Sequence, residues 1–165
     1  MSFEEVYDRY FTRIYNYIRY RVLARDAADD LVSAVFEKVL DKFESFDPGK
    51  APIEPWLFAI ARNTLNDYYR RRKVRGWLSI TDREETIASS ESVEKAAERG
   101  EENAKLLAAL AELSEGEREL IALKFTLDLN NREIAAQTGL GESNVGVTLF
   151  RAMKKLKDRL GPEGI

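Results

Sequence analysis

The sequence predicts an all-α protein made of two small helical domains joined by a flexible acidic linker, with a helix-turn-helix in the second domain. Apolar residues recur every three or four positions over most of the chain, and no segment shows the alternation of a strand. Residues 82–102 interrupt this pattern with eight acidic and three basic side chains. We expect the first domain over residues 1–75, the linker over 76–100 and the second domain over 101–165.

Amphipathic helices are predicted first near the N-terminus. Ser2 and Glu5 form a capping box, and the residues that follow repeat apolar positions at helical spacing. Asp26 and Asp29 have the same spacing and predict the start of a second helix, whose apolar stripe ends at Leu40. The first domain therefore begins with two helices that each have one face to bury.

A third helix is predicted to begin at Pro55, because proline is favoured at the first position of a helix. A turn with the sequence Asp-Pro-Gly at residues 47–49 separates it from the second helix. Its inner face runs over residues 57–68, and its end carries a basic run from Arg70 to Arg75.

Four helices are predicted after the linker. The first is weakly amphipathic and places apolar residues from Ala96 to Leu110 inward, and the second buries Phe125 near its end. The N-termini of the second and third helices are predicted by two capping boxes, Ser114 with Glu117 and Asn130 with Glu133. The third helix is expected over residues 131–138 and the last one over residues 142–160.

The last two helices have the spacing of a helix-turn-helix. Ala135 is the small residue where the helices touch, Gly139 can adopt the left-handed conformation of the turn, and Val145 points back into the core. The remaining inner positions are filled by Ile134 and Leu140. Five residues then face outward, as on a reader of the DNA major groove: Ser143, Asn144, Val147, Thr148 and Arg151. An ordinary helical hairpin with a glycine turn is the alternative, and the basic Lys154 and Lys155 beyond it favour DNA.

The basic end of the third helix is a second candidate surface. A basic run at a helix C-terminus is either a solvated end or a nucleic-acid contact. Tyr68, Tyr69 and Trp77 lie beside the arginines, and such aromatic residues suit unstacked bases. Asn63 and Asn66 lie toward the outer face of the same helix, where amides can bind base edges.

The outer face of the second helix is acidic and is a third candidate surface. Carboxylates can bind metal, but the adjacent Asp29 and Asp30 point in different directions on a helix. The chain contains neither cysteine nor histidine, which excludes thiolate ligands and histidine-based acid–base catalysis. We therefore expect no metal, no cofactor and no enzyme active site, and a solvated face or a docking face for a basic partner.

The N-terminus and the hydropathy of the chain indicate in which cellular compartment the protein is expected. The first five residues lack the basic start and apolar core of a signal peptide. Apolar runs such as residues 106–113 are far shorter than a bilayer span. These patterns predict a cytoplasmic protein without membrane insertion.

Three segments together resemble the extracytoplasmic-function (ECF) group of the sigma-70 family, the sigma factors of bacterial RNA polymerase. Residues 26–36 resemble the family's polymerase-binding helix, residues 56–71 its helix for the minus-ten element, and residues 132–152 its reader of the minus-thirty-five element. The resemblance implies binding to core RNA polymerase, at the clamp helices of its largest subunit, and to promoter DNA. It leaves open an anti-sigma factor as a further partner.

The resemblance also implies which residues serve each contact. Those expected to bind core polymerase are Asp29, Asp30, Ser33 and Glu37. Those expected to bind the minus-ten element are Asn63, Asn66, Tyr69, Arg70, Arg71 and Lys73, with the loop 46–55 holding a flipped base. Those expected to bind the minus-thirty-five element are Arg132, Ser143, Asn144, Val147, Thr148, Arg151, Lys154 and Lys155.

The chain departs from the family at two places. Ser33 and Ala34 stand where glutamine and glutamate are common, and residues 146–148 replace a commonly basic and polar run, which leaves the upstream DNA sequence open. Two other classes stay as alternatives. One is a helix-turn-helix regulator that binds duplex DNA without polymerase, and the other is a helical adaptor with no nucleic-acid role.

Overall fold

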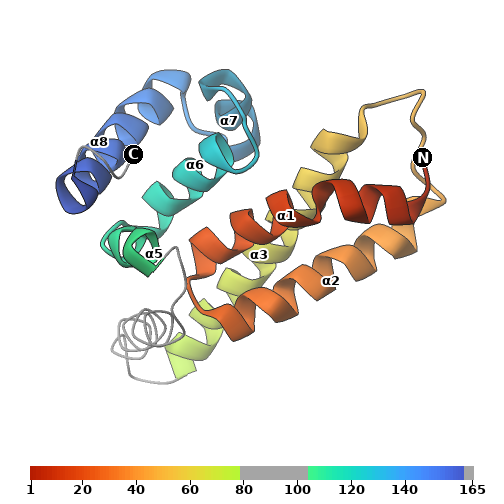
Figure 1. Ribbon diagram of the computed structural model, residues 1–165, viewed down its shortest axis with the longest axis horizontal. Helices are drawn as coiled ribbons and strands as arrows, with labels where there is room; N and C mark the ends of the chain where they lie inside the picture. The colour runs from red at the N-terminus through yellow and green to blue at the C-terminus, as the bar shows by residue number, and fades with distance from the viewer. Residues whose placement is uncertain (79–103, 162–165) are drawn as a thin grey trace.

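Two helical units lie side by side in the computed structural model, which describes residues 1–78 and 104–161 (Figure 1). The first unit contains α1 (Phe3–Val22), α2 (Arg25–Phe43) and α3 (Ile53–Leu78). The second contains α5 (Ala104–Ala111), α6 (Glu115–Phe125), α7 (Asn131–Thr138) and α8 (Glu142–Leu160). The described residues form helices and turns without a strand, so the predicted all-α class is confirmed.

The core of the first unit lies between α1, α2 and α3. Ile14 of α1, Val35 of α2 and Leu57 of α3 are completely buried. On α1, aromatic residues recur every fourth position and form a ladder of rings, which comprises Phe3, Tyr7, Phe11 and Tyr15. This ladder packs on Phe36 of α2, whose ring centroid lies 4.8 Å from that of Tyr7.

Helix boundaries in the first unit confirm one capping prediction and correct another. The Ser2–Glu5 capping box is present in both directions. The Asp26–Asp29 box is wrong: α2 begins at Arg25, and its N-cap Ala24 makes no side-chain bond. Leu23 caps α1 in the left-handed conformation, with φ 66°, and the chain turns so tightly there that α2 starts before Asp26 can cap it.

The start of α3 also differs from its prediction. The helix begins at Ile53, which puts Pro55 at its third position. Proline is tolerated there because the first amides of a helix have no acceptor within it. The other end of α3 runs to Leu78, past the predicted linker start at residue 76, whereas the rest of that linker and the predicted helical residues near Ala96 lie outside the described residues.

The second unit follows the predicted helix-turn-helix. Ser114 and Glu117 form a complete capping box, and Asn130 accepts a hydrogen bond of 2.8 Å from the amide of Glu133. Gly139 ends α7 with φ 77°, the left-handed conformation that its position predicted. The core of this unit is built from Leu107, Leu110, Leu120, Ile134, Val145 and Leu156.

Two apolar residues predicted to be buried in the second unit are exposed. Phe125 is 59% exposed, because α6 ends there and Leu127, 1% exposed, fills the core position beyond the turn. Leu140 is 40% exposed, because it lies in the short turn between Gly139 and Gly141. In the first unit, Leu40 of the predicted inner stripe of α2 is likewise exposed.

Candidate nucleic-acid and polymerase interfaces

The N-terminal half of α8 presents the predicted groove-reading residues on one side. Val145 and Leu149 are buried against α6 and α7, and this fixes the rotation of the helix about its axis. Ser143, Asn144, Val147 and Arg151 are exposed, and Thr148 is partly exposed. The hydroxyl of Thr148 donates a hydrogen bond of 3.2 Å to Oδ1 of Asn144, so these two side chains form one polar unit.

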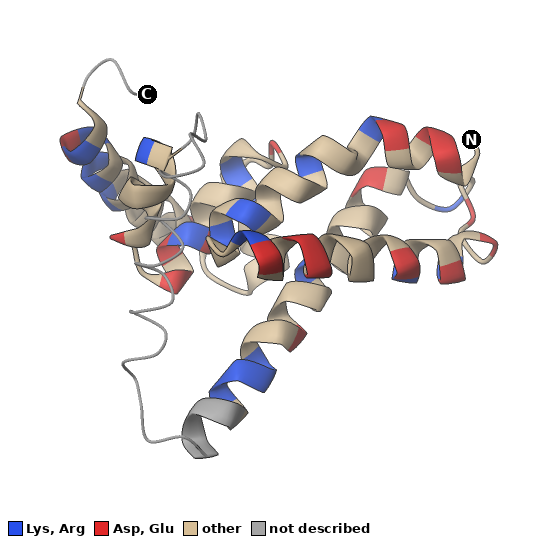
Figure 2. Ribbon diagram, turned by 60° about the horizontal axis from the view of Figure 1, so that its bottom comes forward, with Lys and Arg blue, Asp and Glu red and all other residues tan. Residues whose placement is uncertain are grey.

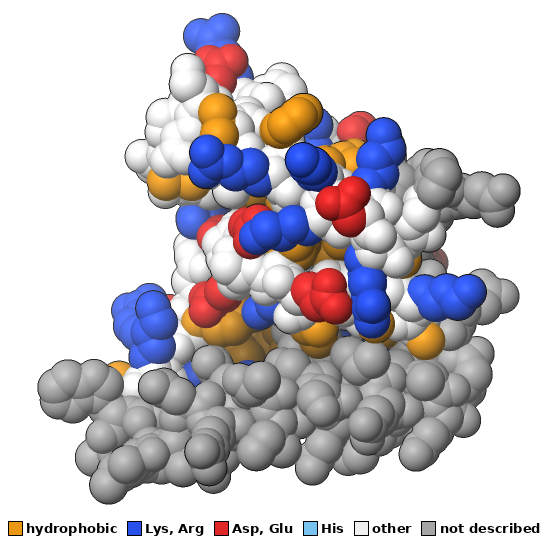
Figure 3. Space-filling view, turned by 90° about the vertical axis from the view of Figure 1, so that its left-hand side faces the viewer, with side chains coloured by type: hydrophobic (Ala, Val, Ile, Leu, Met, Phe, Trp, Pro, Cys, Tyr) orange, Lys and Arg blue, Asp and Glu red, His pale blue; other side chains and the backbone are white. Residues whose placement is uncertain are grey.

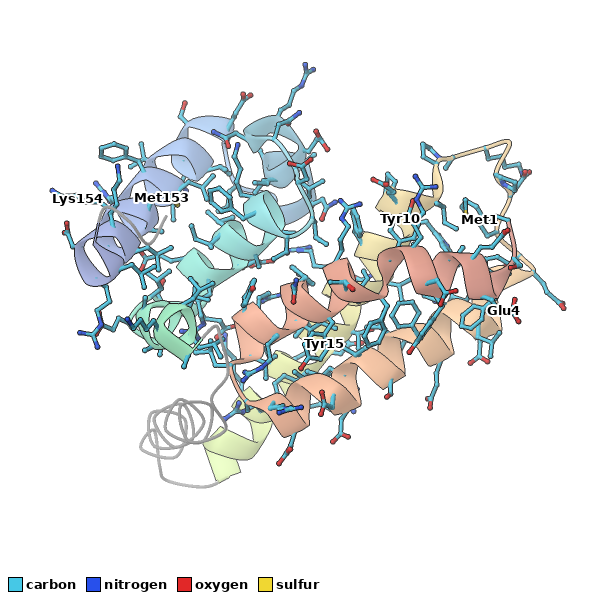
Figure 4. All side chains as sticks on the ribbon, viewed as in Figure 1. Met1, Glu4, Tyr10, Tyr15, Met153 and Lys154 are labelled. Atoms are coloured by element: carbon cyan, nitrogen blue, oxygen red, sulfur yellow. The ribbon has the colours of Figure 1, made fainter. Side chains whose placement is uncertain are left out.

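The C-terminal half of α8 is basic, but its cations differ in their surroundings. Lys154 points away from the molecule on the outer side of α8 (Figure 4). Lys155 instead lies 2.9 and 3.1 Å from the two carboxylate oxygens of Glu117 at the start of α6. Arg159 pairs with Glu112 at 3.4 Å. Lys155 and Arg159 therefore form ion pairs that hold α8 against the rest of its own unit. The sequence did not predict these pairs.

The carboxylate that holds Lys155 is itself strongly engaged. Burial alone would raise the pKa of the Glu117 carboxyl, but hydrogen bonds from the Ser114 backbone and from Lys155 outweigh it and lower that pKa. Glu117 thus stays ionised. It takes part in the capping box of α6 and also pairs with Lys155 of α8. The remaining predicted contact, Arg132, is exposed on α7.

Exposed hydrophobic side chains accompany these cations. Phe150 is 72% exposed and Val147 is 49% exposed, both on α8. The face seen in Figure 3, which is the left-hand side of Figure 1, shows basic side chains with hydrophobic and acidic ones between them. The second unit therefore offers an amphipathic surface rather than a purely cationic one.

The end of α3 carries most of the predicted minus-ten residues at its surface. Asn63, Arg70, Arg71 and Lys73 are exposed and Asn66 is partly exposed. Tyr69 differs, because it is only 9% exposed and its hydroxyl donates a 2.8 Å hydrogen bond to the carbonyl of Arg21. In the described arrangement Tyr69 is thus a packing residue.

The loop before α3 is ordered by its own side chains. The rings of Phe46 and Trp56 lie 4.8 Å apart, and Oδ1 of Asp47 accepts a hydrogen bond of 2.9 Å from the amide of Gly49. These contacts hold the loop at the start of α3, at the end of the helix opposite to Arg70 and Arg71.

Acidic residues follow one side of α2, as Figure 2 shows. The four residues predicted to bind polymerase, Asp29, Asp30, Ser33 and Glu37, are all exposed. Ser33 and Glu37 also border an apolar groove between α1 and α2, lined by Tyr7, Phe36 and Leu40 among others. The spacing of four between the aromatic residues of α1 was the sequence signal for this groove. Among the described residues, no three carboxylates cluster closely enough to hold a metal ion.

The two units meet where α6 packs against α1. Arg13 of α1 donates hydrogen bonds to the carbonyls of Thr126 and Leu127, at 3.5 and 3.0 Å. Arg62 of α3 pairs with Glu119 of α6 at 2.9 Å, and each side chain is about one-fifth exposed. Sequence patterns could not find these contacts, because their partners lie far apart in the chain.

Comparisons with known proteins match both units. Residues 6–75 match the family model for sigma-70 region 2, and residues 103–156 match the model for sigma-70 region 4. The RNA polymerase sigma factor YlaC of Bacillus subtilis is 30% identical over 160 residues, which cover 96% of this chain and 92% of YlaC. The chain is a sigma factor of the sigma-70 family.

Other relatives place this sigma factor in the ECF group. ECF sigma factor SigM of Bacillus subtilis is 29% identical over 95% of this chain and 94% of SigM. ECF sigma factor BldN of Streptomyces coelicolor is 31% identical over 98% of this chain and 61% of BldN. As a sigma factor, the protein binds core RNA polymerase and directs promoter recognition in transcription initiation. This finding sets aside the regulator that acts without polymerase and the helical adaptor.

Solved structures share the fold. The sigma factor RpoE of Bartonella quintana, in complex with the anti-sigma factor NepR, superimposes with a TM-score of 0.69 at 21% identity, over 98% of both chains. CnrH in complex with the cytosolic domain of CnrY gives a TM-score of 0.62 at 25% identity, over 94% of this chain and 85% of CnrH. No helix among the described residues is long and apolar enough to cross a membrane.

Proposed function

We propose that the two units of this sigma factor divide promoter recognition between them. The exposed acidic side of α2 binds the clamp helices of core polymerase, and the end of α3 with the loop before it binds the minus-ten element as it melts. The N-terminal half of α8 reads the minus-thirty-five element as duplex DNA.

One observation supports this division best. The first unit carries two surfaces of opposite charge on different helices, with acidic residues along α2 and exposed arginines at the end of α3 (Figure 2). Arginines suit phosphates, whereas an acidic helix repels them and suits a basic protein surface. The same unit can therefore bind protein on one helix and DNA on another.

The pairing within α8 refines which residues meet DNA. Asn144 and Thr148 form one polar unit at the exposed side of the helix, so we assign them to base edges. Lys154 is free of ion pairs among the described residues and suits a phosphate, whereas Lys155 is held by Glu117 and mainly positions the helix. RpoE of Bartonella quintana is in complex with the anti-sigma factor NepR, and we propose that this sigma factor has an anti-sigma partner as well.

Run-off transcription tests the proposal directly. Core polymerase with this chain, on fragmented genomic DNA, should produce new start sites, and Arg70→Ala with Arg71→Ala should reduce melting at them. Permanganate footprinting measures that melting, and normal melting in the double variant would remove α3 from the minus-ten role. Since core polymerase and promoter DNA share one compartment in bacteria, we place the protein in the cytoplasm and assign it a binding rather than a catalytic role.

A further inference from the structure

One lysine of α2 points away from the acidic side of that helix. Asp41 lies three positions after Lys38, a spacing at which opposite charges on a helix can pair. Among the residues that the structure describes, however, no carboxylate forms an ion pair with Lys38. Its ammonium instead donates a hydrogen bond of 3.2 Å to the hydroxyl of Thr64 on α3.

Thr64 holds this ammonium in a defined place. Thr64 is 4% exposed, and its hydroxyl donates its own proton to the carbonyl of Ile60 at 2.7 Å. The lone pairs of the hydroxyl oxygen are therefore left for Lys38. A lysine ammonium has three donors, so two of them remain for another acceptor. Because Lys38 is only partly buried, an acceptor outside the protein can contact them.

The ammonium of Lys38 borders the proposed minus-ten surface of α3. Asn63 directly precedes Thr64 and is exposed. Arg71 is also exposed, and it lies two helical turns after Thr64 and thus on the same side of α3. Lys38 therefore adds a positive charge from α2 to those of α3, at a distance of about 10 Å from Arg71 along the helix axis.

The proposed polymerase face lies at the other edge of α2. Ser33 and Glu37 border the groove between α1 and α2, whereas Lys38 contacts α3. The completely buried Val35 and Val39 lie between these two edges of the helix. A change at Lys38 therefore leaves the polymerase face in place.

We propose that Lys38 is a further DNA contact of this sigma factor, and that its ammonium binds a phosphate of the minus-ten strand as it melts. The proposal rests on the proposed minus-ten role of α3. A phosphate oxygen accepts the donors that Thr64 leaves, and a lysine binds phosphate as a point charge without selecting a base. If Lys38 only joined α2 to α3, its loss would lower stability without changing the salt dependence of DNA binding.

Two substitutions separate the charge of Lys38 from its hydrogen bond. Lys38→Gln keeps a donor for Thr64 and removes the charge, whereas Lys38→Arg keeps the charge. Lys42→Gln is the matched control, because Lys42 is an exposed lysine one turn later on the same helix. Each variant would be assembled with core polymerase and titrated, at several salt concentrations, with a dye-labelled fork-junction DNA. This DNA would carry the minus-ten region of a start site found by run-off transcription.

The expected result is specific to the charge at position 38. Lys38→Gln should weaken DNA binding about fivefold at about 0.1 M salt and lower the salt slope by about 0.7, which corresponds to one phosphate of a single strand. Lys38→Arg and Lys42→Gln should stay within about twofold of the unaltered chain. An unchanged slope for Lys38→Gln would overturn the proposal, and so would an equal loss in either of the other two variants.

Two further measurements identify which proposal fails. Affinity for core polymerase should be the same with Lys38→Gln as with the unaltered chain, and a weaker complex would assign Lys38 to the polymerase face instead. Arg70→Ala with Arg71→Ala tests the minus-ten role of α3 by itself. If this double variant bound the fork normally, that role would be wrong. If it bound weakly while Lys38→Gln bound normally, only the contact of Lys38 would be wrong.

Discussion

The hydroxyl of Tyr69 donates a hydrogen bond of 2.8 Å to the backbone carbonyl of Arg21, while the guanidinium of Arg21 lies 5.1 Å from the Tyr69 ring. Tyr69 thus ties α3 to the end of α1 at a point where both helices meet α6. The sequence suggested that Tyr69 stacks on bases, whereas in this arrangement it packs between helices.

Tyr69→Phe should destabilise the protein by about 1 kcal/mol, because it removes the hydroxyl and leaves the buried carbonyl of Arg21 without that donor. Urea unfolding followed by circular dichroism measures the change. Tyr15→Phe is the matched control, since Tyr15 lies on α1 and is only partly buried. Equal stability of the two variants would show that the bond contributes little.

Buried tyrosines predict a loss of stability in alkali. Burial raises the pKa of both Tyr17 and Tyr69, and it outweighs the opposite effect of Arg21. The folded state therefore holds these protons more tightly than the unfolded state does. The contribution of these two tyrosines to the free energy of unfolding is fully present below the unfolded pKa of about 10. It is lost as pH rises through the folded pKa values. Urea midpoints between pH 8 and pH 11 should fall, and they should fall less steeply in a Tyr17→Phe, Tyr69→Phe variant.

Gly146→Ala should stabilise the second unit by up to about 1 kcal/mol, because alanine is the better helix former. An added Cβ would meet only Nδ2 of Asn131, at the ordinary contact distance of 3.6 Å. Gly139→Ala should have the opposite effect, since φ at this position is +77° and a side chain is strained there. Thermal unfolding of the two variants should shift in opposite directions. A lowered melting temperature for Gly146→Ala would reveal a packing constraint at α8.

Asn144→Ala should relax the base preference at one or two upstream base pairs, because a bidentate base contact contributes about 1–3 kcal/mol of discrimination. Lys154→Ala should instead weaken binding to all sequences alike and lower the salt slope by about one. Selection from a randomised upstream element, bound by the holoenzyme, distinguishes these effects. An unchanged selected motif for Asn144→Ala would place the reading surface elsewhere on α8.

Charge reversal on α2 should weaken binding to core polymerase. Asp30→Arg with Glu37→Arg removes two exposed negative charges from the acidic side of the helix and leaves the buried side intact. Titration of labelled chain with core polymerase should show at least a tenfold weaker complex, which corresponds to about 1.4 kcal/mol. Asp8→Arg on α1 is the control and should bind nearly as well as the unaltered chain. Equal affinity of all three proteins would rule out this face.

Local signals in the sequence predicted local structure. The box at Ser2 and the box at Ser114 need only residues three positions apart, and Gly139 needs only its own backbone freedom, so all three were confirmed. The Asp26 box failed because the conformation of Leu23 sets where α2 begins, and spacing alone does not reveal that conformation.

The exposure and the ion pairing of individual side chains depend on contacts between segments that lie far apart in the sequence. Burial of Tyr69 requires the end of α1 and the nearby α6, and the partner of Arg62 lies 57 positions away along the chain. The sequence predicted a DNA contact for Lys155 but could not predict its pairing with Glu117, which lies 38 positions earlier. Periodicity indicates which side of a helix is apolar, but it does not indicate which other helix covers its polar side.

The contact between the tilted rings of Phe46 and Trp56 allows this loop to be followed by fluorescence. Indole emission responds to neighbouring rings and to water, and Trp56 lies beside the very loop that is proposed to hold a flipped base. The chain has one other tryptophan, Trp77, so Trp77→Phe leaves a single emitter at this loop. Its fluorescence would then report, in real time and without any dye, when the loop leaves the helix during promoter melting.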